Sequence, residues 1–324
     1  MARRDTAFSR QERPVAIAGE PVMMELTGSA AAAGERCLLE GAGDMTADVP
    51  EVRRIGGYVG AEIRGLDLTR EYPDATYAAI RRAWAEHGVI FFRDQFLDAE
   101  QRERFALRFG PIRTTQQLRK EPDQTRNIGE SWHVDMTCFD EPPMGTMLFA
   151  EECPEYGGDT LWSHMVPAYE ALSDGLKRTL LGMRAVHANV RKLGLSYEQT
   201  SPPEPSISEY DAAEGPLHPV ITRHPETGKL ILYVNPEYTT RFEGWTRRES
   251  LGLLRYLFDH GGKAEWVTRF TWQPGSIAFW DNRQVWHMAV NDYHGMRRVM
   301  NRILLAGSAP VPAELPQAEA ALAS

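Results

Sequence analysis

Residues 270–305 read FTWQPGSIAFWDNRQVWHMAVNDYHGMRRVMNRILL. Within this stretch, three short apolar runs, at 270–272, 276–280 and 299–305, are bounded by charged or turn-forming residues. Runs of this length with such boundaries are typical of β-strands. The stretch therefore predicts three strands, and runs of the same kind recur upstream.

Four further strands are expected at 147–150, 160–163, 218–223 and 230–234. The last two flank Pro225-Glu-Thr-Gly-Lys229, which is typical of a hairpin loop because Gly tolerates a positive φ. From residue 132 onward the chain is thus rich in short strands.

The N-terminal part of the folded region predicts a helix at 75–87, a buried strand at 88–92 and a second helix at 98–108. The strand is a continuous apolar run between Gly88 and a charged pair. Asp98 with Gln at position 101 has the spacing of a capping box, which marks a helix start.

Two more helices are expected at 167–181, with Ser173 as an internal cap, and at 247–260. The helices do not alternate regularly with the strands. This pattern predicts a mainly β fold with flanking helices, a sandwich or jelly roll rather than a doubly wound parallel sheet.

The two ends of the chain differ from its middle in composition. Residues 1–51 are rich in Ala and Gly without a sustained period, and residues 309–324 carry prolines among alanines. We therefore expect a mobile N-terminal extension over 1–51, one domain over 52–308 and a flexible tail over 309–324.

Composition restricts the partners and the location. The chain has 324 residues and a net charge of −9, so nucleic acid and anionic membranes are not expected as partners. Its three cysteines are too few for a disulfide framework, and neither a signal peptide nor a membrane-spanning run is recognised. We expect a cytoplasmic protein.

The segment Trp132-His-Val-Asp135 carries a candidate metal site. On a strand, alternate side chains share a face, so His133 and Asp135 can bind one ion side by side. His287 is the best candidate for a third ligand. Two histidines and one carboxylate on one side of Fe(II) leave positions open for a co-substrate and oxygen.

Two arginines follow this third ligand. On a strand, Arg298 and Arg302 face the same side, while Val299 and Asn301 face the other. A buried guanidinium needs an anion, and a dicarboxylate co-substrate supplies one. Thr160, at the start of an expected strand, adds a hydroxyl donor.

Over residues 52–308 the chain resembles the TauD/TfdA family of Fe(II)/2-oxoglutarate-dependent dioxygenases. Beyond the metal and arginine motifs, the resemblance rests on GAEIRGLDL at 60–68, FRDQ at 92–95, GGDT at 157–160, HPV at 218–220, HPETG at 224–228 and WDNR at 280–283. So many motifs in the same order are specific together.

The resemblance implies a double-stranded β-helix, which is a cupin-like jelly roll, and an enzyme that uses Fe(II), 2-oxoglutarate and O2. By this similarity the iron ligands, which carry the catalysis, are His133, Asp135 and His287. The 2-oxoglutarate carboxylate distant from the keto group would be held by Arg298 and Thr160, and Arg302 would lie in the substrate pocket.

The same resemblance implies hydroxylation of a small, anionic organic substrate with release of succinate and CO2. Where the attacked carbon carries a heteroatom, a C–S, C–O or C–N bond would then break. Further candidates for substrate binding are Arg113, Asn127, Ser131 and Tyr238. Residues 109–113 and 128–129 depart from the family's taurine-binding pattern and argue against taurine itself, while Asp135 argues against halogenation.

Two alternatives stay open from the sequence. The same iron centre could serve desaturation or oxidative decarboxylation in a biosynthetic pathway. More remotely, the chain could be a non-enzymatic jelly-roll binding protein with a structural metal, although structural zinc usually has four protein ligands and only three are identified. A homo-oligomer is a further expectation from the family.

Overall fold

The computed structural model describes residues 49–189 and 214–314.

The central strands of the largest sheet are apolar on both faces. In β3 (Val89–Phe92), Ile90 and Phe92 enter one apolar cluster while Val89 and Phe91 enter another. The same alternation holds in β5 (Gly145–Glu152) and β13 (Ile277–Asp281). Because both faces are covered, these strands read as continuous apolar runs rather than alternating ones.

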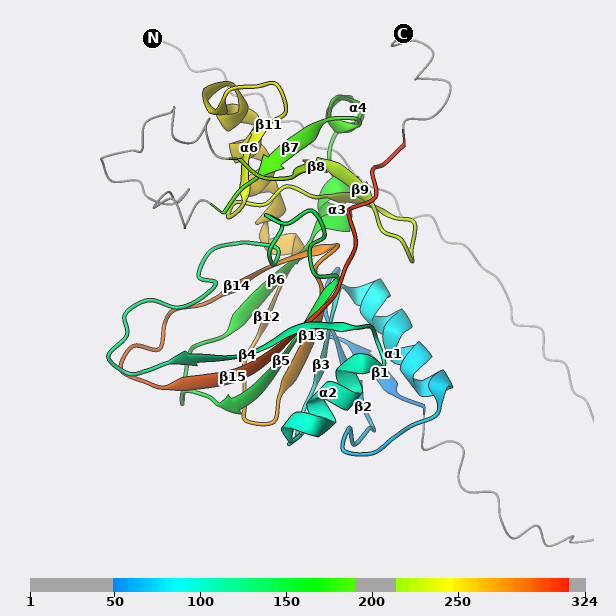
Figure 1. Ribbon diagram of the computed structural model, residues 1–324, viewed down its shortest axis with the longest axis vertical. Helices are drawn as coiled ribbons and strands as arrows, with labels where there is room; N and C mark the ends of the chain where they lie inside the picture. The colour runs from blue at the N-terminus through cyan, green and yellow to red at the C-terminus, as the bar shows by residue number, and fades with distance from the viewer. Residues whose placement is uncertain (1–48, 190–213, 315–324) are drawn as a thin grey trace, which may run out of the picture. The chain divides into compact units, whose positions relative to one another are not determined.

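These strands lie in a seven-stranded sheet with the order β1-β2-β3-β13-β5-β15-β4 (Figure 1). Its other members are β1 (Glu51–Arg54), β2 (Ala61–Arg64), β4 (Ile112–Lys120) and β15 (Arg298–Leu305). All neighbouring pairs are antiparallel except β2 with β3. The sheet therefore joins the first and last described strands of the fold through central strands that are far apart in sequence.

A second sheet has the order β12-β6-β14 and faces the first across an apolar layer. It consists of β6 (Thr160–His164), β12 (Val267–Phe270) and β14 (Val285–Ala289). Large aromatic side chains fill the layer, among them Trp162 and Trp280, whose ring centroids are 5.7 Å apart. Two mainly antiparallel sheets packed face to face confirm the predicted mainly β jelly roll.

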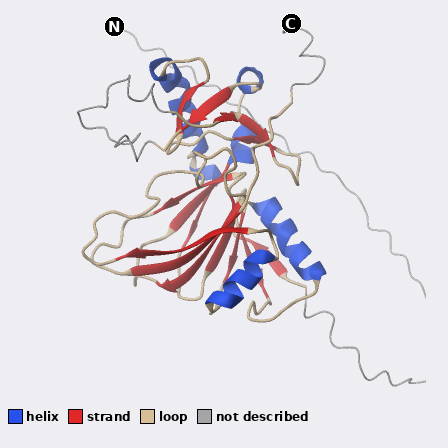
Figure 2. Ribbon diagram, viewed as in Figure 1, coloured by secondary structure: helices blue, strands red, loops and turns tan. Residues whose placement is uncertain are grey.

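Two helices cover the outer face of the large sheet (Figure 2). These are α1 (Asp74–His87) and α2 (Ala99–Leu107). Trp84 of α1 stacks on Phe279 of β13 at 4.3 Å between ring centroids. The capping box of Asp98 with Gln101 is present at the start of α2, as the sequence predicted.

The remaining elements form a third group around their own apolar cluster, at the top of Figure 1. They are α3 (Met165–Glu170), α4 (Asp174–Leu180), β7 (Arg184–His187), β8 (Leu217–Pro219), β9 (Ile221–Arg223), β10 (Leu230–Leu232), β11 (Thr239–Phe242), α6 (Arg247–Gly261) and the 3-10 helix η2 (Ala264–Trp266). Short ladders join β7 to both β11 and β8, and β10 to β9.

Several expected boundaries were wrong. The single helix expected at 167–181 is two helices, because Ser173 is the N-cap of α4 rather than an internal residue. The strand expected at 218–223 is divided between β8 and β9, which pair with different neighbours. The strand expected at 270–272 lies earlier in the chain, as β12, which ends at Phe270 where its pairing with β6 stops.

The ends of the domain stay predictions. The described residues, 49–189 and 214–314, all belong to one compact unit. Residues 309–314 of the expected tail include Val311 and Ala313, which form backbone hydrogen bonds with Arg223 and Ile221 of β9. Residues 1–48 of the extension expected over 1–51, and residues 315–324 of the tail expected over 309–324, lie outside the described residues. In the described part of the chain, every helix is too short or too polar to cross a bilayer.

Candidate metal centre

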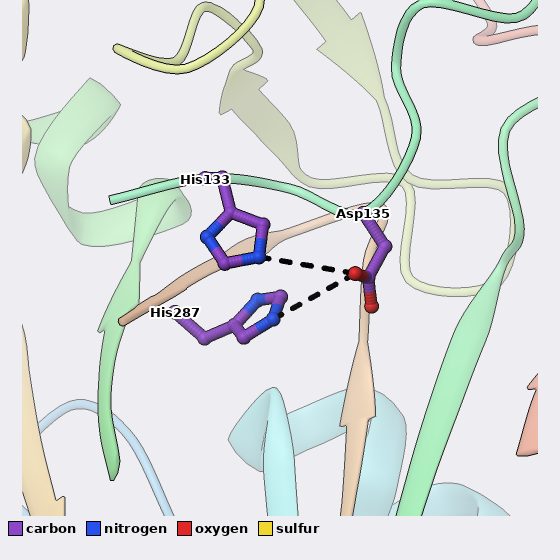
Figure 3. Close-up of side chains that lie close together, drawn as sticks. All are labelled: His133, Asp135 and His287. Carbon is purple, nitrogen blue, oxygen red and sulfur yellow. Dashed lines mark ion pairs between the residues drawn. The ribbon is translucent and has the colours of Figure 1, made fainter. Parts of the chain in front are cut away.

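The three predicted metal ligands come together inside the jelly roll. His133, Asp135 and His287 are all buried, and each offers a donor atom within 4.8 Å of the donors of the other two. Oδ1 of Asp135 lies 3.9 Å from Nε2 of His133 and 3.8 Å from Nε2 of His287 (Figure 3). Two imidazole nitrogens and one carboxylate oxygen are the donor set that suits Fe(II) with open positions.

The local backbone differs from the expected strand. Only His133 pairs, through an isolated antiparallel bridge to His287 of β14, and the chain then turns with Met136 at a φ of 54°. The strand expected to carry His133 and Asp135 is therefore reduced to one bridge, although the proximity of the two side chains is confirmed.

A hydrogen bond of the other ring nitrogen leaves Nε2 of His133 available to a metal. Its Nδ1 lies 2.8 Å from the carbonyl oxygen of Ser131 and donates to it. With Nδ1 protonated, the lone pair of the neutral ring is on Nε2, the atom that faces Asp135. For His287, burial lowers the pKa well below its ordinary value, so this imidazole is neutral near pH 7 and able to bind a cation.

The Asp135 carboxylate is held by a chain of side-chain hydrogen bonds. The Thr146 hydroxyl donates to Asp135 Oδ2 at 2.6 Å, and Asn282 Nδ2 donates to the Thr146 hydroxyl at 2.8 Å. Trp280 Nε1 in turn donates to Asn282 Oδ1 at 2.9 Å. Burial alone would raise the pKa of Asp135, but the His287 imidazole, the Arg302 guanidinium, the His133 imidazole and the Thr146 hydroxyl outweigh it and lower that pKa. The carboxylate is thus ionised and fixed in orientation.

The predicted alternation along β15 is confirmed. Arg302 points toward the metal ligands, with Nη1 3.6 Å from Asp135 Oδ1 and Nη2 donating to Gln116 at 2.8 Å. Asn301 points the other way and donates to Glu151. Nε of Arg302 is buried and makes no hydrogen bond with any described residue. The guanidinium therefore has a donor left for another group beside the metal ligands.

Arg298 lies on the same face of β15 and is buried. Its Cζ is 5.6 Å from the ring centre of Trp272, whose Nε1 donates to the Thr160 hydroxyl at 2.9 Å. Since this bond uses a lone pair of the hydroxyl, the Thr160 proton is available to an acceptor. Trp272 thus links the two residues expected to hold 2-oxoglutarate.

The remaining sequence candidates lie in varied surroundings. Ser131 donates to Glu237, and Asn127 lines a pocket that Arg298 also lines. Arg113 donates to the carbonyl of Glu141 and lies over the ring of Phe139, and the backbone N–H of Tyr238 donates to the side chain of Asn235. Their roles in binding a substrate stay predictions.

Sequence reasoning missed Thr146, because an isolated Thr in an apolar strand carries no pattern that points to a carboxylate ten or so residues away. Asn282 lies within the WDNR segment that contributed to the family resemblance. That motif was the available signal, and its asparagine orients the metal ligand Asp135 through Thr146.

Comparison with known proteins identifies the family. The family described as "Taurine catabolism dioxygenase TauD, TfdA family" matches residues 51–304. The chain belongs to this family. It is accordingly an α-ketoglutarate-dependent dioxygenase, an oxidoreductase that uses Fe(II), 2-oxoglutarate and O2, and the structure supplies the His-Asp-His site that such an enzyme requires.

Two curated relatives align with most of the sequence of this TauD/TfdA family member. It is 34% identical to an alkylsulfatase of Acinetobacter baylyi over 79% of this chain and 85% of the relative. It is 32% identical to an α-ketoglutarate-dependent sulfate ester dioxygenase of Pseudomonas putida, over 81% of this chain and 91% of the relative. A solved structure of a taurine dioxygenase from Burkholderia xenovorans is 34% identical, with a TM-score of 0.70 over 81% of this chain and 93% of that one.

Proposed function

We propose that this dioxygenase hydroxylates a small organic anion at the carbon atom that is bonded to the heteroatom of the anionic group. Sulfate esters are the substrate class that we propose. In this proposal His133, Asp135 and His287 hold Fe(II), Arg298 and Thr160 hold the distal carboxylate of 2-oxoglutarate, and Arg302 holds the anionic group of the substrate.

The donor set supports the metal assignment. The imidazoles of His133 and His287 are ring-to-ring neighbours with centroids 4.0 Å apart, and the ionised carboxylate of Asp135 completes one side of the site. When bound, Fe(II) together with 2-oxoglutarate and O2 supplies the oxidant for a C–H bond. The protein's own part is to orient the ligands, through Thr146 and the carbonyl of Ser131, and to hold the two anions nearby.

The position of Arg302 carries the proposal about the substrate. Its guanidinium is 3.6 Å from a metal-ligand oxygen, and its buried Nε has no hydrogen-bond partner in the described structure. A sulfate or carboxylate bound there would place its own carbon chain beside the metal centre. Guanidinium groups suit such planar or tetrahedral oxyanions because they donate two parallel hydrogen bonds.

The reaction balances for a sulfate ester. One oxygen atom of O2 is inserted into the C–H bond next to the ester oxygen, and the other enters succinate as 2-oxoglutarate loses CO2. The hydroxylated carbon then releases sulfate by breaking its C–O bond and becomes an aldehyde. The names of the two curated relatives, an alkylsulfatase and a sulfate ester dioxygenase, support this choice.

A panel of matched substrates tests the proposal. Succinate release is measured with hexyl sulfate, hexanesulfonate, a phenoxypropionate and uncharged hexanol. We expect hexyl sulfate to stimulate succinate release, with one inorganic sulfate formed per succinate, and hexanol to have little effect. Stimulation by hexanol equal to that by the anions would contradict the proposal, and an alkene product in place of sulfate would indicate desaturation.

Other expectations stay predictions from the sequence: a cytoplasmic location, a homo-oligomer, and the absence of nucleic acid or membrane partners. Sedimentation of the purified protein would test the oligomer directly.

A further inference from the structure

Two buried cations face each other across the ladder between β4 and β15. Lys120 and Arg298 are direct cross-strand partners. The relative solvent exposure is only 4% for Lys120 and 6% for Arg298. Side chains of directly opposed residues stand on the same face of a sheet, with Cβ atoms about 4.5–5.5 Å apart. Like charges in this position destabilise the pairing. Their side-by-side burial therefore needs a compensating group.

The described residues do not supply that compensation. The Lys120 ammonium makes neither a hydrogen bond nor an ion pair with any of them, and Nε and Nη2 of Arg298 make no hydrogen bond with them either. The carboxylate of Asp159 acts on Arg298 electrostatically, but it is already paired with Arg269. Nζ of Lys120 instead lies 3.9 Å from the ring centre of Tyr293. This ring holds the ammonium in place but leaves its donors unused.

Both cations line a pocket of about 410 Å³. Among the described residues of its lining, the cationic ones are Arg119, Lys120, Arg126 and Arg298, and the single acidic one is the exposed Asp123. Arg119 and Arg126 are already paired with Glu121 and Glu130. Among the described residues, Lys120 and Arg298 are therefore the cations of this lining that make no ion pair. The pocket is suited to an anion.

We propose that Lys120 is a second cationic residue of the 2-oxoglutarate site, and that its ammonium binds the same distal carboxylate as Arg298. This inference rests on the proposed role of Arg298. A carboxylate has about four acceptor positions on its two oxygens. Arg298 and Thr160 leave room for a further donor, and Tyr293 keeps the ammonium at that place. Lys120 thus selects a dicarboxylate over a keto acid that lacks the distal carboxylate.

Binding of two keto acids to the Mn(II)-loaded protein tests this role. The first is 2-oxoglutarate and the second is 2-oxopentanoate, which has the same chain length but ends in a methyl group. Isothermal titration calorimetry gives both affinities for Lys120→Met and for Lys263→Met, a matched control at an exposed lysine. We expect Lys120→Met to weaken 2-oxoglutarate binding about tenfold or more, the usual range for a hydrogen bond to a charged group. Binding of 2-oxopentanoate should be unchanged, and Lys263→Met should affect neither.

Two further measurements separate this inference from the proposed function. Lys120→Arg, which keeps the charge, should recover most of the affinity for 2-oxoglutarate. Without ligand, Lys120→Met should melt at the same or a higher temperature, because a repulsion is removed; a clearly less stable protein would mean that the ammonium serves the fold, and would overturn the inference. Equal losses for both keto acids would overturn it as well.

Arg298→Met decides which claim fails. If it abolishes the preference for 2-oxoglutarate while Lys120→Met does not, the assignment of Arg298 stands and the role of Lys120 is wrong. If neither variant changes the preference, the proposed 2-oxoglutarate site itself is wrong.

Discussion

His133 and His287 exchange both backbone hydrogen bonds of an antiparallel bridge, with N–H to carbonyl distances of 3.0 and 2.8 Å. The bridge attaches the segment before Asp135 to the edge of β14. The spacing of the two imidazoles is thereby fixed by the main chain, and the side chains need only small adjustments to reach a common ion. Such pre-organisation is what a metal centre requires of its supporting structure.

The lack of a side chain at Gly129 leaves space for the His133 ring, so Gly129→Ala should weaken metal binding. A Cβ at this position would lie 3.0 Å from His133 Cε1, and its φ of +80° is unfavourable for Ala. Gly228 is a matched control, because its φ is +69° but a Cβ there would meet none of the described atoms within 4 Å. Both variants should lose about 1–2 kcal/mol of unfolding free energy. Only Gly129→Ala should also lose affinity for Mn(II) in a titration, and equal affinities in the two variants would refute this account of the glycine.

Thr146→Val should lower the metal affinity without unfolding the protein. The substitution keeps the shape of the side chain but removes the hydroxyl that joins Asp135 to Asn282. Loss of such an orienting partner typically costs about 10–100-fold in metal affinity. Thr146→Ser keeps the hydroxyl and should bind Mn(II) nearly as well as the wild type. An unchanged dissociation constant in Thr146→Val would show that the hydroxyl does not orient the carboxylate.

Arg302→Met should raise the KM for the anionic substrate far more than the requirement for 2-oxoglutarate. Breaking a buried charge pair costs roughly 3–5 kcal/mol, which corresponds to more than a hundredfold in affinity. Because Arg302 is also 3.6 Å from Asp135, the Mn(II) affinity of the variant must be measured alongside. Steady-state kinetics in each co-substrate gives the comparison. A rise confined to 2-oxoglutarate would assign the arginine to the co-substrate instead.

Asp281→Asn should destabilise the fold in a pH-dependent way. This fully buried carboxylate accepts hydrogen bonds from His224 at 2.9 Å and from Arg283 at 2.6 Å. Burial alone would raise the pKa of Asp281, but the charge and hydrogen bonds of Arg283, with His224, hold it far below its ordinary value. A depressed pKa contributes stability that is complete above the unfolded value of about 3.9 and is lost as the pH falls toward the folded value.

Urea unfolding at pH 7 and at pH 3 measures this contribution. At pH 7 the variant should lose about 3–5 kcal/mol, the cost of breaking a buried ion pair, and the gap to the wild type should narrow at pH 3. Asp74→Asn is the control, since Asp74 pairs with Arg108 at the exposed surface and should change stability by less than about 1 kcal/mol. A gap that is constant with pH would mean that the Asp281 charge contributes nothing to stability.

The sequence predicted those features that depend on local patterns. The capping box of α2 and the apolar run of β3 were both recognisable because each follows from a few adjacent residues. In contrast, β4 reads IRTTQQLRK and is mostly exposed, so neither an apolar run nor an alternation marked it. Its strand conformation comes from pairing with β15, a partner that is distant in sequence.

The same distinction applies to the site. Residue type and spacing indicated His133, Asp135, His287 and Arg298, and the family resemblance then implied a role for each. Thr146 could not be predicted, because its role depends on which carboxylate the fold places 2.6 Å away. Lys120 lies in a polar edge strand, and only its burial opposite Arg298 distinguishes it from an ordinary surface lysine.

The absorption spectrum under anaerobic conditions tests the central claim most directly. Fe(II) and 2-oxoglutarate are added without oxygen to the wild-type protein and to His287→Ala. We predict a visible charge-transfer band in the wild type and its loss in the variant, with Lys263→Met retaining the full band. A wild-type protein without the band, or a His287→Ala protein with a band of equal strength, would contradict the assignment of these three side chains to an iron centre.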